Sequence, residues 1–327
     1  MSRRSKKKHI NRKRIYTHII KVRCCTSSKR TFSEIADEWL RSVSHSLKES
    51  SAATYSHKLN KHIIPYFRDT DFSAISKNCI IGFIDYQISQ GKSRQYVSYM
   101  LTIIKAIYRY AYDEYGYKNI TLNIPALPAS HSRVYILNSV QQEKLIHYLD
   151  THPDTTSLAV AVSLFTGLRI GEICALKWSD IDLNERILHV NKTVQRITSS
   201  NGSKKTKVII TSPKSESSVR DIPLPPRIID MLGSFKRDND NYIISEDRDP
   251  VEPRTLQYRF ERLLDDADLP QIRFHSLRHM FASNALMLGF DIKSLSEILG
   301  HSSANVTLKL YVHSSLGVKR EYMNLLG

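Results

Sequence analysis

The chain has 327 residues, of which 41% are hydrophobic and 24% are charged, and its formal net charge is +16 at pH 7. This length suffices for two domains, and a positive charge of this size indicates a polyanionic partner such as nucleic acid. No apolar run reaches about 18 residues, no apolar core follows the basic start, and the four cysteines lack paired spacing, so we expect a cytoplasmic protein without a membrane span, secretory signal, disulfide framework or structural zinc site.

The N-terminal segment 1–30 carries most of the excess charge. It contains twelve Lys or Arg residues and no Asp or Glu. Such a run is typical of a flexible arm that follows phosphate backbones without reading sequence, and a solubilising or targeting tail is the alternative. The basic residues of this arm that we expect to contact DNA are Arg3, Arg4, Lys6, Lys7, Lys8, Arg12, Lys13 and Arg14.

Amphipathic helices are predicted from residue 31 onward. Thr31 and Glu34 have the spacing of a capping box at the start of the first helix. Further helices are predicted at about 51–64, where Pro65 ends the pattern, at about 77–90 and at about 93–115. The last of these begins with polar residues suited to a DNA groove. The expected DNA contacts in this region are Lys92, Arg94, Gln95 and Lys105.

Residues 119–134 are predicted to be a linker, because they contain two prolines and a Ser-His-Ser run. The second unit, 135–327, is predicted to have helices at about 139–150, 155–166, 253–267, 276–288, 292–299 and 303–312. Between them, segments 187–197, 207–211 and 219–224 are rich in β-formers around an Asn201-Gly202 turn, which predicts one small antiparallel sheet. The fold class is therefore mainly α with a small antiparallel β-sheet, arranged as a two-domain clamp.

Six residues of the second unit lie in five separate motifs and together have the chemistry for attacking a phosphodiester. They are Arg169, Lys214, His275, Arg278, His301 and Tyr311. The transition state spreads negative charge over the non-bridging oxygens, and a guanidinium matches two such oxygens at once. Each residue alone would be read as ordinary packing or a surface charge, but their joint occurrence favours catalysis without a metal or another cofactor.

The six residues divide into a clamp and a set of proton-transfer groups. Arg169 and Arg278 are the expected clamp on the phosphate. A tyrosine hydroxyl is a weak nucleophile until a nearby base helps to remove its proton, and the two histidines can supply that base. Lys214 is suited to protonate the departing sugar oxygen. Tyr311 is the expected nucleophile.

The five motifs resemble those of the tyrosine recombinases of the phage-integrase family. They read Thr-Gly-Leu-Arg-Ile-Gly-Glu at 166–172, Ser-Pro-Lys-Ser at 212–215, His-Ser-Leu-Arg-His at 275–279, Leu-Gly-His-Ser-Ser at 299–303 and Tyr-Val-His at 311–313. The resemblance implies that Glu172 is a supporting acid and that His279 supports the second box. It covers roughly residues 31–327, and none of the six catalytic positions departs from the family pattern.

The resemblance further implies an activity and an assembly. Residues 31–118 would be a helical, SAM-like core-binding domain on double-stranded DNA, and 135–327 the catalytic domain. Tyr311 would form a 3′-phosphotyrosyl intermediate, and a homotetramer on two duplexes would pass through a Holliday junction, with accessory DNA-bending or excision factors as further partners. The tail at 318–326 would dock on a neighbouring protomer or on its own domain.

Four functions stay open from the sequence. The basic lead favours an integrase of a phage or conjugative element. An Xer-type chromosome or plasmid dimer resolvase shares the chemistry. A non-cutting DNA-binding protein at recombination sites is the alternative from another class, and a relaxing topoisomerase is the enzymatic rival.

Overall fold

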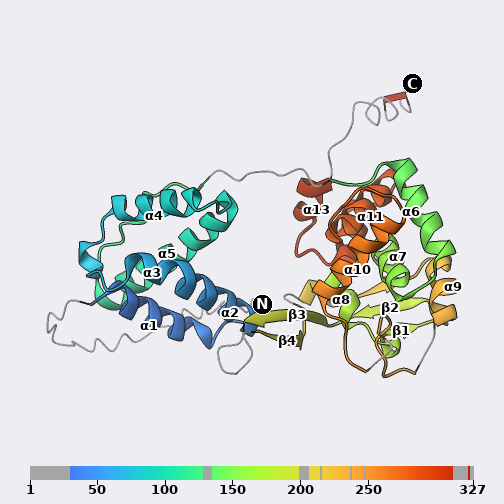
Figure 1. Cartoon of the computed structure of the whole chain (residues 1–327), viewed down its shortest axis with the longest axis horizontal. Helices are drawn as coiled ribbons and strands as arrows, with labels where there is room; N and C mark the ends of the chain where they lie inside the picture. Colours follow the sequence, from blue (N-terminus) through green and yellow to red (C-terminus); the bar gives the residue numbers. More distant parts are fainter. Residues whose placement is uncertain are drawn as a thin grey trace, which may run out of the picture.

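The computed structural model describes residues 30–127, 135–198, 206–213, 216–235, 238–245, 248–311 and 323–324. These residues are mostly helical, with two small antiparallel sheets, and they form two groups of elements around separate hydrophobic cores (Figure 1). One core runs from Phe32 to Ile124 and the other mainly from Leu137 to Met280. The predicted fold class is confirmed.

The N-terminal group packs short helices against one long helix. Its elements are α1 (Phe32–Ser44), α2 (Glu49–Lys58), a π-helical turn (Leu59–Ile63), α3 (Ile64–Phe67), α4 (Lys77–Ser89) and α5 (Arg94–Tyr115). The predicted capping box is present, since Thr31 Oγ1 accepts from the Glu34 backbone N–H and the Glu34 carboxylate accepts from the Thr31 N–H. The helix predicted to end at Pro65 instead continues to Phe67. The π turn places Pro65 at the start of a new helical segment, where its missing N–H is not needed.

The C-terminal group places helices around a three-stranded sheet and carries a separate two-stranded hairpin. Its helices are α6 (Ser139–Thr151), α7 (Thr155–Thr166), α8 (Ile170–Ala175), α9 (Pro226–Phe235), α10 (Pro253–Asp266), α11 (His275–Met287), α12 (Ile292–Leu299) and α13 (Ala304–Tyr311). The helices that the sequence predicted here are confirmed to within about two residues. The sequence missed α9, which buries Ile228 and Leu232.

The prediction of a single sheet was wrong. Strands β1 (Ile181–Asp182), β2 (Ile187–Val190) and β5 (Arg220–Pro223) form one sheet in the order β1-β2-β5, whereas β3 (Thr193–Thr198) and β4 (Thr206–Thr211) pair only with each other. The predicted strand 187–197 breaks at residues 191–192, where the Lys192 ammonium donates to both carboxylate oxygens of the buried Asp180. The Asn201-Gly202 turn lies outside the described residues.

The β3–β4 hairpin reaches toward α2 of the N-terminal group (Figure 1). The Lys48 ammonium, at the start of α2, donates to the carbonyl oxygen of Pro213 at 2.6 Å, and Lys207 on β4 pairs with Glu49 at 2.5 Å. These contacts join the two groups next to residue 214. Across the described part of the chain, no helix combines the length and the apolarity that a membrane crossing requires.

Candidate active site

Four of the six predicted catalytic residues lie together in the C-terminal group. Arg278 Nη2 lies 2.9 Å from His301 Nε2, and Arg169 Nη2 lies 3.4 Å from the carbonyl oxygen of Gly300. Arg169 and His275 line the same open cleft of about 460 Å³. Residues from the N-cap of α8, from α11 and from the turn after α12 thus meet at one place, although 132 sequence positions separate Arg169 from His301.

A glycine turn sets the position of Arg169. Helix α7 ends at Thr166, and Gly167 adopts a left-handed conformation with φ +69°, after which Arg169 is the N-cap of α8. A Cβ at Gly167 would lie 2.5 Å from Cδ1 of Phe281, so a side chain here would push α7 away from α11. Both the left-handed backbone conformation and the close packing of α7 against α11 therefore require glycine at this turn.

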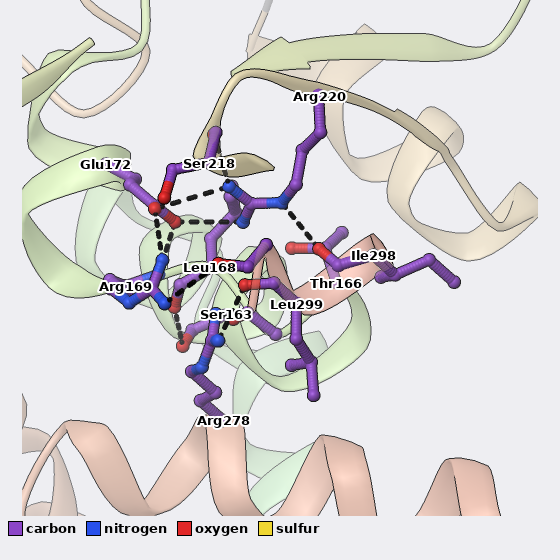
Figure 2. Close-up of polar contacts among 12 residues, drawn as sticks. Ser163, Thr166, Leu168, Arg169, Glu172, Ser218, Arg220, Arg278, Ile298 and Leu299 are labelled. Carbon is purple, nitrogen blue, oxygen red and sulfur yellow. Dashed lines mark hydrogen bonds and ion pairs between the residues drawn. The ribbon is translucent and has the colours of Figure 1, made fainter. Parts of the chain in front are cut away.

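Arg278 is buried under this turn rather than projecting into solvent. It is 1% exposed and is the largest fully buried side chain among the described residues. Its guanidinium donates to the carbonyl oxygen of Leu299 at 2.6 Å (Figure 2) and to that of Gly167 at 2.7 Å. It also donates to His301 Nε2 at 2.9 Å. A buried charge needs such hydrogen bonds to offset its desolvation. Arg278 thereby holds the ends of α7 and α12 together.

Glu172 lies between two guanidinium groups (Figure 2). Arg169 Nη1 lies 2.7 Å from Glu172 Oε1, and Arg220 Nη2 lies 3.0 Å from Glu172 Oε2. Burial alone would raise the pKa of Glu172, but the charges and hydrogen bonds of Arg220 and Arg169 lower its pKa overall. Glu172 is therefore ionised at neutral pH, and it fixes the orientation of Arg169, whose side chain is still 36% exposed.

The hydrogen bonds of His301 determine its tautomer. Because a guanidinium can only donate, His301 Nε2 accepts from Arg278, and the proton therefore resides on Nδ1, which donates to Thr307 Oγ1 at 2.9 Å. Thr307 is fully buried and belongs to α13. Desolvation and the charges of Arg278 and Arg169 lower the pKa of His301 to about 4.

His275 is held near a second histidine. Desolvation, together with the charges of His279 and Arg278, lowers the pKa of His275 to about 4. The rings of His275 and His279 meet edge to face with centroids 4.9 Å apart. At pH 7, His275 and His301 are thus both neutral. Because the ring nitrogens of His301 already bond Arg278 and Thr307, His275 is the better candidate for a general base. An anion bound between the arginines would stabilise the protonated, charged forms of these two histidines.

We expect the unfolding free energy to fall as the pH is lowered from about 6.5 toward 4. The histidine pKa values are depressed in the folded state, so the unfolded state binds protons first and gains stability over this range. Urea denaturation of wild type and His301→Gln, measured at each pH, checks this. As the pH falls, the unfolding free energy of wild type should decrease more steeply than that of His301→Gln. The difference in slope should correspond to the uptake of up to about one additional proton on unfolding. Parallel curves would show that the pKa of His301 is not depressed.

Other predicted site residues lie in different surroundings. Lys214 and the arm 1–29 lie outside the described residues, and Tyr311 is the last residue of α13, one turn after Thr307. Arg94 and Gln95 are exposed at the start of α5, and Lys92 is half-buried just before it. The ammonium of Lys105, one of the expected DNA contacts, donates to the carbonyl oxygen of Ile124 at 2.9 Å and is half-buried. This contact favours a structural role for Lys105.

Arg220 and Thr307 complete the site, and neither was singled out by residue chemistry in the sequence. Arg220 lies on the same face of β5 as the buried Ile222, so strand alternation carried a signal for an inward-facing arginine. Two guanidinium groups, from Arg169 and Arg220, contact the carboxylate of Glu172, and a third, from Arg278, bonds the neighbouring carbonyl oxygen of Gly167. The described residues hold no cluster of three or more acidic, histidine or cysteine side chains placed to bind a metal ion. The excess positive charge suits an anionic ligand.

Known proteins share both the sequence pattern and the fold. The XerC-like tyrosine recombinase of Caldanaerobacter subterraneus subsp. tengcongensis is 28% identical over 251 residues, which are 68% of this chain. The match spans 63% of that relative, which is less than two thirds of its length. The ICEBs1 integrase of Bacillus subtilis is 25% identical over 269 residues, which are 78% of this chain and 71% of that integrase. The putative prophage phiRv2 integrase of Mycobacterium tuberculosis is 27% identical over 304 residues, 90% of this chain and 78% of that relative.

The folds of two DNA-bound integrases are similar to this one. The Tn1549 transposon integrase in complex with a circular intermediate DNA superposes with a TM-score of 0.75 at 19% identity, covering 91% of this chain and 100% of that one. The lambda integrase dimer bound to a core site superposes with a TM-score of 0.64 at 22% identity, covering 84% of this chain and 97% of that one. Residues 31–87 match the N-terminal SAM-like domain of phage integrases. Residues 136–316, more than half of the chain, match the phage integrase family, and the chain belongs to this family of tyrosine recombinases.

Proposed function

We propose that this protein is a site-specific DNA recombinase that integrates or excises a mobile element by cleaving and rejoining DNA strands. The observation that carries the proposal is the cluster in which Arg278 contacts His301 while Arg169 and His275 line one cleft. Two arginines beside neutral histidines can bind a phosphodiester and accept a proton from its attacker. This combination fits phosphoryl transfer better than a passive DNA contact, for which lysines and arginines alone suffice.

The proposed reaction begins with the attack of Tyr311 on the scissile phosphate. The phenolic oxygen forms a bond to phosphorus, its proton passes to a neutral histidine, and the bond to the 5′ oxygen of the next nucleotide breaks. Lys214 supplies the proton that this leaving oxygen takes up. Arg169 and Arg278 stabilise the charge on the non-bridging oxygens, and Glu172 and His279 support Arg169 and His275.

The 3′-phosphotyrosyl bond conserves the energy of the phosphodiester, so no ATP is required. A 5′-hydroxyl from the partner duplex then attacks this bond and releases Tyr311, which produces a Holliday junction after one pair of exchanges. A second pair of exchanges resolves the junction. We propose four protomers on two duplexes; a lambda integrase tetramer bound to a Holliday junction has a similar fold, with a TM-score of 0.63 at 22% identity over 84% of this chain and 78% of that one.

We propose that the two hydrophobic cores correspond to two DNA-binding domains. The unit 31–118 would bind the duplex through residues near the start of α5, including Arg94 and Gln95, and the unit 135–327 would bind it through the active site. The linker 119–134 and the basic arm 1–30 complete this division. Support comes from the family matches to each unit. The cytoplasmic location and the accessory DNA-bending or excision factors stay predictions.

Among the alternatives, the basic arm favours an element integrase over an Xer-type resolvase, and relatives of both kinds are present. The test uses two linear duplexes and, in parallel, a supercoiled plasmid, all carrying the DNA that flanks this protein's own gene. Joined products from both duplexes would support a recombinase. Relaxation of supercoiled plasmid without joined products would favour a topoisomerase, and specific binding with neither product would favour a non-cutting protein.

We expect Lys214→Ala to slow cleavage of an ordinary duplex by about 10²–10⁴-fold, the usual contribution of a general acid. A duplex with sulfur in place of the scissile 5′ oxygen should restore the rate, because a thiol with a pKa near ~8.5 leaves without a proton. Single-turnover cleavage of both duplexes measures this. Arg278→Lys is the matched control, since it should remain slow on both. No sulfur rescue of Lys214→Ala would assign Lys214 another role.

A further inference from the structure

Arg220 contacts three segments that lie beside predicted catalytic residues, through Glu172, Ser218 and Ile298 (Figure 2). Its own side chain takes no part in the proposed reaction. It begins β5, six positions after Lys214. Its side chain is 6% exposed, so it is almost completely withdrawn from solvent. A buried guanidinium is retained only where its donors are satisfied, and the acceptors of Arg220 show what it holds in place.

All three nitrogens of the Arg220 guanidinium donate to protein acceptors. Nη2 donates to Glu172 Oε2 at 3.0 Å, and Nη1 lies 3.3 Å from Glu172 Oε1, which makes the contact bidentate. Nη1 also donates to the carbonyl oxygen of Ser218 at 3.0 Å, and Nε donates to the carbonyl oxygen of Ile298 at 2.5 Å. Because each guanidinium nitrogen has a protein acceptor and the side chain is almost completely buried, we expect Arg220 to act on the site through its neighbours.

The contact with Ile298 fixes the turn that carries His301. The last carbonyls of a helix have no partner within the helix, and Ile298 is the next-to-last residue of α12. Gly300 follows with φ +63°, and a Cβ there would lie 3.0 Å from Arg220 Nη1. Arg220 therefore packs directly against the glycine turn and constrains the position of His301, which follows it.

The contact with Glu172 fixes Arg169. The carboxylate bonds Arg169 on one side and Arg220 on the other, so Arg220 determines where the shared carboxylate lies. A lone exposed arginine would hold Glu172 less firmly, since long side chains lose entropy when they are ordered. The buried Arg220 therefore restricts the position of the carboxylate that Arg169 binds.

We propose that Arg220 is a positioning residue for strand cleavage: it holds Glu172, and through it Arg169, in register with the Gly300–His301 turn. The inference rests on the proposed recombinase function. Unlike a merely structural ion pair, Arg220 in this role affects the rate of cleavage and is coupled to Glu172.

The test uses Arg220→Met, which keeps the apolar stem, and Arg220→Lys, which keeps the charge without the bidentate contact. Arg227→Met is the matched control, because Arg227 pairs with Asp150 on an exposed surface of the same unit. Adduct formation is measured in single turnover on a nicked duplex carrying the DNA that flanks the gene. We expect a rate loss of about 10–100-fold for Arg220→Met, a smaller loss for Arg220→Lys, none for Arg227→Met, and DNA affinity within about twofold for all three.

A second readout does not depend on activity. The unfolding free energies of wild type, Arg220→Met, Glu172→Gln and the double variant form a cycle. Because Arg220 lowers the pKa of Glu172, the advantage of wild type over Arg220→Met should be full near pH 7 and lost as the pH falls below about 4.5. In the Glu172→Gln background this pH dependence should vanish.

The outcomes separate the two proposals. If wild type forms the adduct and Arg220→Met reacts equally fast, the inference is wrong while the recombinase function stands. If wild type forms no adduct, the proposed function is wrong and Arg220 has no cleavage role. In that case a pH-independent, additive cycle would also overturn the coupling to Glu172.

Discussion

Arg278→Ala is expected to lower both the cleavage rate and the stability of the protein. The rate should fall by about 10²–10³-fold, the usual effect of removing one donor to the transition-state charge. The unfolding free energy should fall by on the order of 3–5 kcal/mol, because the buried carbonyl oxygens of Gly167 and Leu299 lose their donors and a cavity remains. Single-turnover cleavage and urea denaturation measure the two effects.

Arg278→Lys separates the two contributions. The ammonium keeps the charge and can satisfy one carbonyl, so stability should recover in part, whereas the planar fork that matches two phosphate oxygens is lost. Cleavage should therefore remain slow even where Arg278→Lys is folded. A folded lysine variant with the wild-type rate would contradict the role of Arg278 as a phosphate clamp.

Gly167→Ala is expected to destabilise the catalytic unit through two additive causes. The left-handed backbone at φ +69° costs an alanine about 1–2 kcal/mol, and the new methyl group, 2.5 Å from Phe281 Cδ1 and 2.8 Å from Leu299 Cδ2, adds about 1–3 kcal/mol of overpacking. Relief of the clash would move the Gly167 carbonyl that Arg278 binds. The cleavage rate should therefore fall together with the unfolding free energy.

Gly116→Ala is the matched control for this prediction. Gly116 also ends a helix with a left-handed backbone, at φ +72°, but a Cβ there would meet no atom within 4 Å. The control should lose only the conformational contribution, and its cleavage rate should be unchanged. Equal destabilisation by the two substitutions would show that the packing of α7 against α11 does not constrain Gly167.

The sequence predicted the helices of this fold well, because each carries its own local signals. Helix α7, for example, begins after an Asp154 side chain that caps the Ser157 N–H and ends at Gly167. The sheet was predicted less well, since segment 187–197 is continuous in β-propensity and only the partner strands divide it. Helix α9 was missed, although Pro226 occupies its first helical position, where proline is favoured.

The sequence identified individual residues of the site but not their arrangement in space. The motifs identified Arg169 and Arg278, yet nothing local showed that Arg278 would be buried on two backbone carbonyls or that His301 would accept from it. Those contacts depend on the meeting of α7, α11 and α12. Arg220 illustrates the same limit. Strand alternation with Ile222 places it on the inward face, but arginines are ordinarily exposed, and its tertiary partners Glu172 and Ile298 explain why it is buried.

The most direct test of the central claim identifies the residue that becomes joined to DNA. Wild type and Tyr311→Phe are incubated with supercoiled plasmid carrying the DNA that flanks the gene, with a chelator and without ATP. Any covalent complex is digested and its peptides are mapped by mass spectrometry. We predict a nucleotide joined through its 3′-phosphate to Tyr311, and no complex from Tyr311→Phe. A complex through another residue, a complex that survives the substitution, or none from wild type would contradict the claim.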